Sequence, residues 1–282
     1  MNLAEHVLRA GQAVPDHQAL VVMGADDAQV WTHGDLRRAV LGTATGLTRA
    51  GLRPGDRLLM RLANRPAFPI AYLGAIAAGV IPVPTSAQLT GAEITRIAAR
   101  IAPAMIVAGA GVPLPDHPAP VLTEGDLDGF ATLPPADFAQ GSADRLAYIV
   151  FTSGSSGQPR AVMHAHRAIL ARQAMMAGWY GLRADDRLLH AGAFNWTFTL
   201  GTGLLDPWTL GATALIPADG TPIERIPLLA ARHGATILAG APGVFRRMLR
   251  ADWPPIATLR HALAAGERLD PSLRTAWTAR TG

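Results

Sequence analysis

Short apolar runs alternate along this chain with stretches that have the spacing of amphipathic helices. Parallel strands joined by crossover helices are buried on both faces, so each is expected as a short, continuous apolar segment between two helical ones. The alternation therefore predicts an α/β fold, with mostly parallel sheets flanked by helices. The expected strands are 57–63, 105–108, 212–217, 236–239 and 259–264.

Polar residues at the ends of the helical stretches set their expected limits. Thr32 can cap a helix over 34–50. Thr90 and Glu93 have the spacing of a capping box, in which each side chain bonds the other residue's backbone N–H. This box predicts a second helix that begins there and ends near Ile101.

The longest stretch without charge lies between Arg65 and Glu93. It contains four prolines and three glycines, which interrupt a regular helix. A buried helix that leads into a buried strand fits this pattern, and a membrane span is the alternative that fits it less well. The first 20 residues contain acids and histidines but no apolar core, so they do not form a secretory signal, and the expected compartment is the cytoplasm.

One segment of the chain is repeated. The sequence at 51–59 has a close counterpart at 181–189, and each copy leads through apolar and Gly/Ala-rich stretches to an apolar strand ending in proline. Two similar α/β lobes would produce this echo, although helix-exit turns also converge on Gly and Asp by chance. The predicted lobes are 1–175, which includes a loop at 152–160, and 176–282.

That loop has the chemistry of a phosphate site. An apolar run ending at Phe151 leads into six residues that are all Gly, Ser or Thr, and Pro159 precedes a second apolar run. Glycines allow close backbone approach, and backbone N–H groups with hydroxyls donate to phosphate oxygens. The pattern is not a P-loop, which needs a lysine. The alternative is a flexible surface linker. The loop residues are Thr152, Ser153, Gly154, Ser155, Ser156 and Gly157.

Composition excludes several kinds of chemistry. The chain has 282 residues and no cysteine, which excludes disulfides, thiolate metal sites and cysteine nucleophiles. All 25 basic residues are arginine, so lysine Schiff bases are excluded as well. The net charge of +4 is spread along the chain without basic clusters that contain aromatic residues, so nucleic acid is not an expected partner.

The loop also carries a family resemblance. The segment 152–160 resembles the Thr-Ser-Gly-Ser/Thr-Thr/Ser-Gly-x-Pro-Lys-Gly signature of the AMP-forming, adenylate-forming enzymes, which include acyl-CoA synthetases, adenylation domains and luciferases. Arg160 and Ala161 stand where that family usually has Lys-Gly. The segments 30–36 and 79–84 are similar to structural elements of the family. The resemblance implies two α/β lobes, and it makes the chain an incomplete large amino-terminal domain without the carboxy-terminal lid.

Two later segments extend the resemblance. The segment 191–201 occupies the place where the family sets an aromatic residue against the acyl substrate, which implies substrate contacts for Phe194, Asn195 and Trp196. A core position is the alternative for Trp196. The segment 263–269 is similar to the element that borders adenine, which implies that Gly266 and Glu267 line the nucleotide. For Glu267 the alternative is an acid at a helix amino terminus.

The implied function is ATP-dependent activation of a carboxylic acid to acyl-AMP, followed by transfer to CoA. ATP, Mg²⁺ and CoA are the implied cofactors, and 152–157 with Arg160 would hold phosphates. The family's Mg²⁺ glutamate and its mobile lysine are expected beyond Gly282, so no catalytic residue or metal ligand is assigned within the chain, which is expected to be inactive alone. Alternatives are a non-catalytic protein that binds nucleotide or a partner, and an unrelated phosphate-binding transferase. His164 and His166 are expected to be structural.

Overall fold

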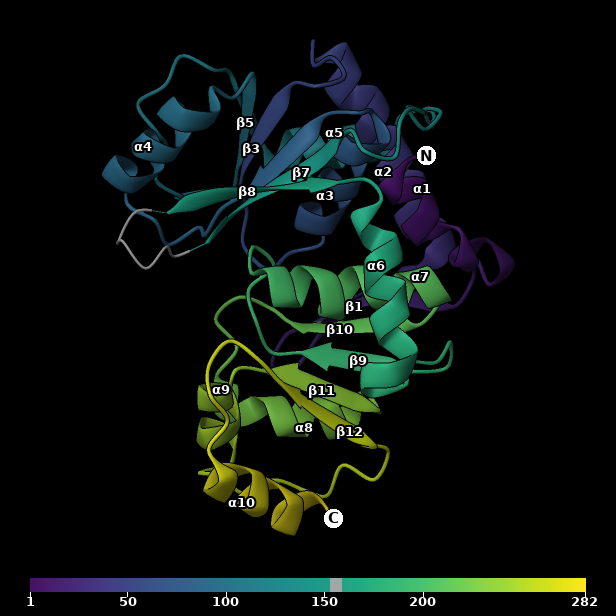
Figure 1. The fold of residues 1–282 in the computed structure, drawn as a ribbon, viewed down its shortest axis with the longest axis vertical. Helices are drawn as coiled ribbons and strands as arrows, with labels where there is room; N and C mark the ends of the chain where they lie inside the picture. The colour runs from purple at the N-terminus through teal and green to yellow at the C-terminus, as the bar shows by residue number, and fades with distance from the viewer. Residues whose placement is uncertain (153–158) are drawn as a thin grey trace. The chain divides into compact units, whose positions relative to one another are not determined.

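The computed structural model describes residues 1–152 and 159–282, which form two compact units (Figure 1). Unit 1 consists of Met1–Arg9 and Asp35–Ala171, and unit 2 consists of Ala10–Gly34 and Arg172–Gly282. This division ends unit 1 close to the expected lobe boundary after residue 175. It differs from the expected lobes in assigning 10–34 to the second unit, because a strand in that segment pairs with strands from the second half of the chain.

Unit 1 contains a four-stranded parallel sheet in the order β4-β3-β5-β6 and an antiparallel hairpin of β7 and β8. One side of the parallel sheet packs against the apolar face of helix α4 and against β7. The elements are α1 (Leu3–Leu8), α2 (His33–Arg49), β3 (Arg57–Arg61), α3 (Ala67–Ala77), β4 (Ile81–Pro84), α4 (Gly91–Ile101), β5 (Met105–Ala108), β6 (Val121–Thr123), α5 (Glu124–Ala131), β7 (Leu146–Thr152), β8 (Arg160–Ala165) and α6 (Ala168–Met175).

Unit 2 contains a six-stranded sheet in the order β12-β11-β9-β10-β1-β2, in which only β2 is antiparallel to its neighbour. The elements are η1 (Ala10–Ala13), β1 (Gln18–Met23), β2 (Ala28–Thr32), the π-helix η2 (Met176–Tyr180), β9 (Arg187–His190), the π-helix η3 (Thr199–Leu205), α7 (Asp206–Leu210), β10 (Thr213–Pro217), η4 (Ile223–Arg225), α8 (Ile226–Arg232), β11 (Ile237–Gly240), α9 (Pro242–Met248), β12 (His261–Ala264) and α10 (Pro271–Thr281).

The two faces of the unit 2 sheet have different partners. Leu189 packs with α8, α9 and α10, whereas its neighbour Leu188 packs with η2 on the opposite face. Successive side chains of a strand point to opposite faces, so His190 lies on the same face as Leu188. A polar residue therefore stands where a buried parallel strand ends.

Most of the expected elements are present, so the predicted α/β class with mostly parallel sheets is confirmed. The capping box of Thr90 and Glu93 forms at the start of α4. The uncharged stretch forms α3 and β4, and α3 is buried along nearly its whole length. Among the described residues, no helix combines the length and apolarity that crossing a bilayer would take. The expected strand 57–63 is two residues too long, because β3 leaves its partner β5 after Arg61.

The sequence echo corresponds to a structural repeat. β3 lies between β4 and β5 in unit 1, and β9 lies between β10 and β11 in unit 2. The turn before each strand is closed in the same way, because Asp56 Oδ2 accepts from the Arg53 N–H and Asp186 Oδ2 accepts from the Arg183 N–H, each at 2.7 Å. The repeated segment therefore encodes one turn-and-strand unit that is used twice.

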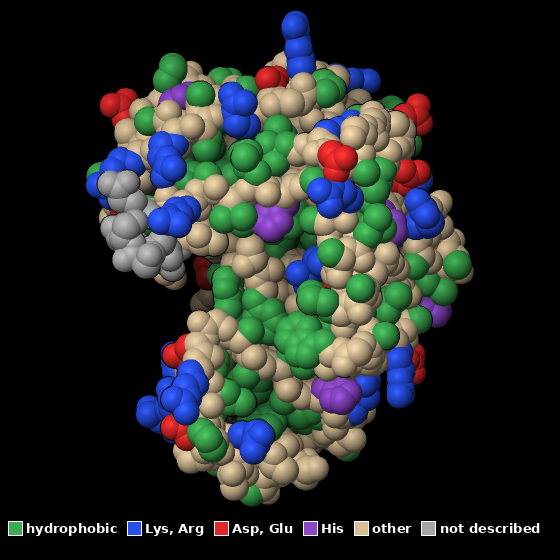
Figure 2. All heavy atoms as spheres, viewed as in Figure 1, with side chains coloured by type: hydrophobic (Ala, Val, Ile, Leu, Met, Phe, Trp, Pro, Cys, Tyr) green, Lys and Arg blue, Asp and Glu red, His purple; other side chains and the backbone are tan. Residues whose placement is uncertain are grey.

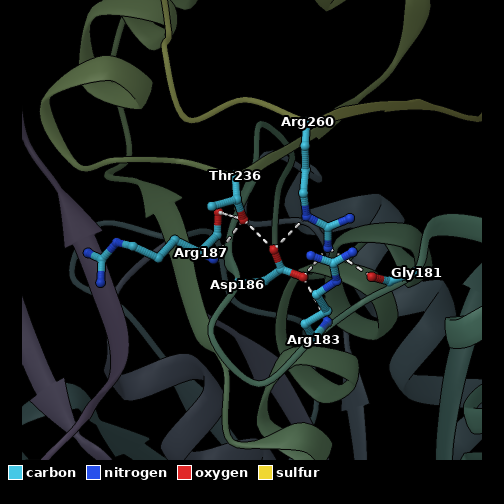
Figure 3. A network of polar contacts seen from close by, with 6 residues as sticks. All are labelled: Gly181, Arg183, Asp186, Arg187, Thr236 and Arg260. Atoms are coloured by element: carbon cyan, nitrogen blue, oxygen red, sulfur yellow. Dashed lines mark hydrogen bonds and ion pairs between the residues drawn. The ribbon is translucent and has the colours of Figure 1, made fainter.

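The second copy has an added polar network around Asp186 (Figure 3). Asp186 is buried and forms an ion pair with Arg260, and its Oδ1 accepts from the Thr236 hydroxyl at 2.6 Å. Arg260 also donates to the Gly181 carbonyl at 2.8 Å. The network therefore joins the start of β9 to the residues that precede β11 and β12.

Candidate functional site

The predicted phosphate loop connects the two strands of the hairpin. Thr152 and Arg160 are paired at the open end of β7 and β8, and both are exposed. The remaining predicted phosphate contacts, Ser153, Gly154, Ser155, Ser156 and Gly157, lie outside the described residues. Thr152 and Arg160 are thus the last described residues of the two strands at this end of the hairpin.

A pocket of about 350 Å³ lies beside this hairpin in unit 1. Arg100 Nη1, at the end of α4, donates to the carbonyl of Pro159 at 2.6 Å and so joins the helix to the hairpin. The lining combines apolar side chains with three charged groups of α4. It consists of Leu89, Glu93, Arg96, Ile97, Arg100, Phe151 and Pro159.

The second group of predicted residues lies in unit 2, where three parallel strands end. Gly192 to Trp196 follow β9, Gly243 belongs to the first turn after β11, and Gly266 and Glu267 follow β12. Open parallel sheets bind ligands outside the carboxyl ends of their strands. We refer to His190, Trp196, Gly243, Gly266 and Glu267 as the strand-end cluster.

Direct contacts hold this cluster together. Glu267 Oε1 accepts a hydrogen bond from the Gly243 N–H at 2.9 Å, so the segment after β12 satisfies a donor at the start of α9. Gly266 has a φ of +101°, and a Cβ placed on it would lie 2.9 Å from Trp196 Cζ2. A glycine is therefore needed at this position for two reasons, backbone conformation and close approach of the indole ring.

The expected substrate residues have different environments. Phe194 is only 1% exposed and lies in the core, whereas Asn195 and Trp196 are half-buried. The indole of Trp196 makes edge contacts with Phe198, at a ring-centre distance of 5.2 Å, and with His190, at 5.9 Å. Of the three predicted substrate residues, Asn195 and Trp196 can be reached from the surface.

His190 is a member of the cluster that sequence reasoning did not identify. It is fully buried in edge contact with Phe198, at 4.5 Å between ring centres, and neither ring nitrogen has a hydrogen-bond partner among the described residues. Burial lowers the pKa of His190 to about 3, so the ring is neutral at physiological pH. The signal that could have found it is a lone histidine ending an otherwise apolar strand.

In unit 1 the position equivalent to His190, which is the last residue of the central strand of the repeat, is occupied by an arginine. Arg61 ends β3 and is fully buried, and its guanidinium donates to backbone carbonyls that include those of Leu89 and Pro113, at 2.9 and 3.0 Å. Burial lowers the pKa of Arg61. Backbone carbonyls therefore satisfy the buried polar group at this strand end, whereas in unit 2 the described residues include no hydrogen-bond partner for His190.

The two histidines after the loop have structural contacts. His166 is buried, and its Nδ1 accepts from the Leu3 N–H at 3.0 Å. His164 stacks on Tyr148 with ring centres 4.5 Å apart. Among residues 1–152 and 159–282, no three His, Asp or Glu side chains gather where they could hold a metal ion, so we assign no residue to Mg²⁺.

Basic and acidic side chains are interspersed on the face that Figure 2 draws. The described residues include ion pairs of Arg247 with Glu224 and of Arg280 with Asp252. These two arginines therefore form ion pairs within the protein.

Comparison with known proteins identifies relatives over nearly the whole chain. A family model described as AMP-binding enzyme matches residues 7–282. A 3-hydroxybenzoate–CoA/4-hydroxybenzoate–CoA ligase of Thauera aromatica is 28% identical over 273 residues, which cover 87% of this chain and 51% of that ligase. A benzoate–CoA ligase of the same organism is 30% identical over 282 residues, which cover 91% of this chain and 53% of that ligase.

The fold is also similar to solved structures. The N-terminal domain of FACL13 from Mycobacterium tuberculosis superposes with a TM-score of 0.85 at 19% identity, covering 99% of this chain and 74% of that domain. At this identity the similarity concerns the fold alone. The chain spans about half the length of the curated relatives it matches.

Proposed function

Because the chain belongs to the AMP-binding enzyme family, we propose that it is part of an ATP-dependent acid–CoA ligase. In this reaction a carboxylate attacks the α-phosphorus of ATP, which gives acyl-AMP and pyrophosphate. The thiol of CoA then attacks the acyl carbonyl and releases AMP. The observation that carries the proposal is the family match over 7–282. It is supported by the glycine-rich sequence at 152–157 and by Trp196, Gly266 and Glu267, which lie in segments that resemble the family's motifs.

In this proposal the chain contributes binding and orientation. Residues 152–157 hold the β- and γ-phosphates, and Arg160 adds positive charge at the end of the same hairpin. Phosphoryl transfer depends mainly on positioning and charge neutralisation, which such donors supply without a protein nucleophile. Mg²⁺ would add charge neutralisation when bound.

The strand-end cluster would bind the adenylate. Gly266 brings backbone close to the ligand, and Glu267 is held in place by the Gly243 N–H, next to the adenine side. The half-buried Trp196 and Asn195 lie near the acyl group. This arrangement supports a flat, aromatic acid, because the half-buried side chains after β9 include the aromatic rings of Trp196 and Phe198 and the curated relatives described above act on benzoates.

The test is acid-dependent exchange of labelled pyrophosphate into ATP, measured for the 282-residue chain and for any longer product of the same gene. Exchange with benzoates, followed by CoA-dependent release of AMP, is the expected result for a longer product. Exchange with fatty acids but not with benzoates would contradict the aromatic assignment. Absence of exchange with every acid would contradict the ligase assignment.

A non-catalytic nucleotide-binding protein is the second candidate. It is favoured by the absence of lysine from these 282 residues, which leaves arginine as their only fixed positive side chain for phosphate contacts. Binding of ATP without exchange, in every product of the gene, would support it.

A further inference from the structure

A cavity of about 700 Å³ lies at the other end of the unit 2 sheet, and all of its lining residues belong to unit 2. It lies where the adjacent strands β9, β10 and β1 begin, because Arg187, Thr213 and Gln18, the first residues of these strands, line it. Arg187 and His190 are the two ends of β9, so the cavity and the strand-end cluster are roughly 10 Å apart along this strand. The cavity is therefore separate from the candidate adenylate site.

The structural repeat shows which residues around this cavity the fold itself requires. In both copies the acid just before the strand closes the turn, Asp56 in unit 1 and Asp186 in unit 2. The position before that acid is Gly55 in the first copy and Asp185 in the second. Asp185 is exposed, and its carboxylate has no hydrogen-bond or ion-pair partner among the described residues. The turn therefore forms without the charge that Asp185 adds to the cavity.

The arginine at the start of the repeated strand is also used differently in the two copies. Arg57 donates through Nε and Nη2 to two backbone carbonyls at the end of α4. Arg187 donates through Nε to the carbonyl of His233, just after α8, at 2.7 Å, but its Nη2 donates to Oε1 of Gln18 at 3.0 Å. Its Nη1 has no partner in the part of the chain that the structure describes. The guanidinium of Arg187 thus retains a free donor at the wall of the cavity.

The corner beside the turn is packed more tightly in the first copy. A Cβ placed on Gly79 would lie 3.2 Å from two side chains, one of which is Pro54. In the second copy Ala184 stands in place of Pro54, and a Cβ placed on Gly211 would meet its nearest neighbour, Val14, only at 3.6 Å. The second copy therefore leaves space where the first copy has none, and the cavity occupies that space.

The lining of the cavity offers charges of both signs above an apolar floor. The carboxylates of Asp16 and Asp185 are exposed, and neither is paired with a described residue, while Arg187 supplies the opposite charge. An ammonium group matches the carboxylates, and a carboxylate matches the guanidinium. No three His, Asp or Glu side chains of the described residues gather where they could hold a metal ion, so a divalent cation does not match. The floor consists of Ala13, Val14 and Leu210.

We propose that this cavity binds a zwitterion with an apolar body, either an apolar amino acid or a short apolar peptide. The ammonium group of the ligand pairs with Asp16 and Asp185, its carboxylate pairs with Arg187, and its apolar side chain lies on Val14 and Leu210. The volume falls within the range of small-molecule sites, about 300–1,000 Å³. The ligand takes no part in the proposed reaction, because it binds at the opposite end of the strands.

The experiment compares a zwitterion with its two halves. Ligand-observed NMR titration of the 282-residue chain measures the affinities for leucine, leucyl-leucine, 3-methylbutylamine and 4-methylpentanoate. The last two are leucine without its carboxylate and leucine without its ammonium group. Leucine or leucyl-leucine is expected to bind at least about tenfold more tightly than either half, because each half lacks one charge-assisted contact. The tighter of the two zwitterions identifies the ligand as a free amino acid or as a peptide.

Variants locate the binding in this cavity. Asp16→Asn and Asp185→Asn keep the side-chain shape but remove a charge, and each should weaken binding of the preferred zwitterion at least about tenfold. Both positions are exposed, so the variants are expected to fold. Neither should change the affinity for 4-methylpentanoate, which has no ammonium group. Asp219→Asn is the matched control, because Asp219 is exposed beyond the other end of β10, and it should bind the zwitterion as the wild type does.

Two results would overturn the inference. If both zwitterions bind no more tightly than the two halves of leucine, the cavity does not recognise opposite charges on one ligand. If a zwitterion binds tightly but Asp16→Asn and Asp185→Asn leave its affinity unchanged, it binds elsewhere and the assignment of this cavity fails. Neither result bears on acid-dependent pyrophosphate exchange, which tests the proposed function separately.

Discussion

Gly266 lies so close to the indole ring of Trp196 that a Cβ on the glycine would come within 2.9 Å of Trp196 Cζ2. Gly266 follows β12 and Trp196 follows β9, and these two strands are separated in the sheet by β11. The contact therefore spans the end of three parallel strands and sets the position of the aromatic ring beside the proposed adenine side.

Replacing Gly266 with alanine should destabilise the chain by about 1–3 kcal/mol, because the φ of +101° is strained for alanine and the new Cβ displaces the indole. The matched control is Gly220→Ala, whose φ is +79° but whose Cβ would meet nothing within 4 Å. Urea unfolding of both variants measures the difference. Equal losses would show that the contact with Trp196 contributes nothing.

The structural repeat offers a second matched pair. Asp186→Ala should cost about 3–5 kcal/mol of unfolding free energy, because it removes one partner of a buried ion pair with Arg260 and leaves the Thr236 hydroxyl without its acceptor. Asp56→Ala removes the same turn bond at a half-buried position and should cost only about 1 kcal/mol. Chemical denaturation of both variants tests this ranking. A larger loss of unfolding free energy for Asp56→Ala than for Asp186→Ala would contradict it.

Stability should fall on acidification partly through His166. Its pKa is lowered to about 4 by burial and by the positive charges of Arg145 and the amino terminus. The pKa of His166 in the folded chain lies below its ordinary value of 6.5, so the unfolded chain takes up the proton first as the pH falls. The contribution of His166 to the free energy of unfolding is therefore complete above pH 6.5 and is lost as the pH falls towards 4. His166→Gln should reduce the slope of the unfolding free energy against pH by at most about 1.4 kcal/mol per pH unit in this window. Unfolding curves between pH 4 and 7 that keep the wild-type slope would exclude this role.

Two tryptophans distinguish a ligand contact from a core position. Trp208 is fully buried and donates to the Ala19 carbonyl at 2.7 Å, so Trp208→Ala should cost about 3–5 kcal/mol. Trp196 is half-buried, so Trp196→Ala should cost less and should shift preference towards analogues of bulkier acids. Thermal melting and titration with naphthoyl and benzoyl sulfamoyl adenosines measure both effects. A loss for Trp196→Ala as large as for Trp208→Ala, with uniform weakening, would place Trp196 in the core.

Local signals in the sequence predicted much of the fold. The capping box at Thr90 and the apolar run at 105–108 gave α4 and β5 with the observed bounds, because both depend on neighbouring residues alone. The assignment of 10–34 to unit 2 could not be predicted in this way. It depends on the pairing of β1 with β10, and no local pattern records a partner nearly 200 residues away.

Only part of the candidate site could be predicted from the sequence, because the rest also depends on which distant segments become neighbours. The motifs marked Gly266, Glu267 and Trp196, but the bond from Gly243 to Glu267 and the unpaired state of His190 depend on which strands become neighbours. Phe194 illustrates the limit, since its place in the motif does not indicate that its ring points into the core.

The strand-end cluster is proposed to bind the acyl-adenylate intermediate, and the affinity of the 282-residue chain for an analogue of this intermediate measures that binding directly. Calorimetric titration with hydroxybenzoyl sulfamoyl adenosine should give a dissociation constant in the micromolar range or tighter for the wild type and for Gly220→Ala. Gly266→Ala should weaken it at least about tenfold, because the new Cβ blocks backbone approach and moves Trp196. An unchanged affinity in a folded Gly266→Ala variant, or no binding by the wild type, would contradict the claim.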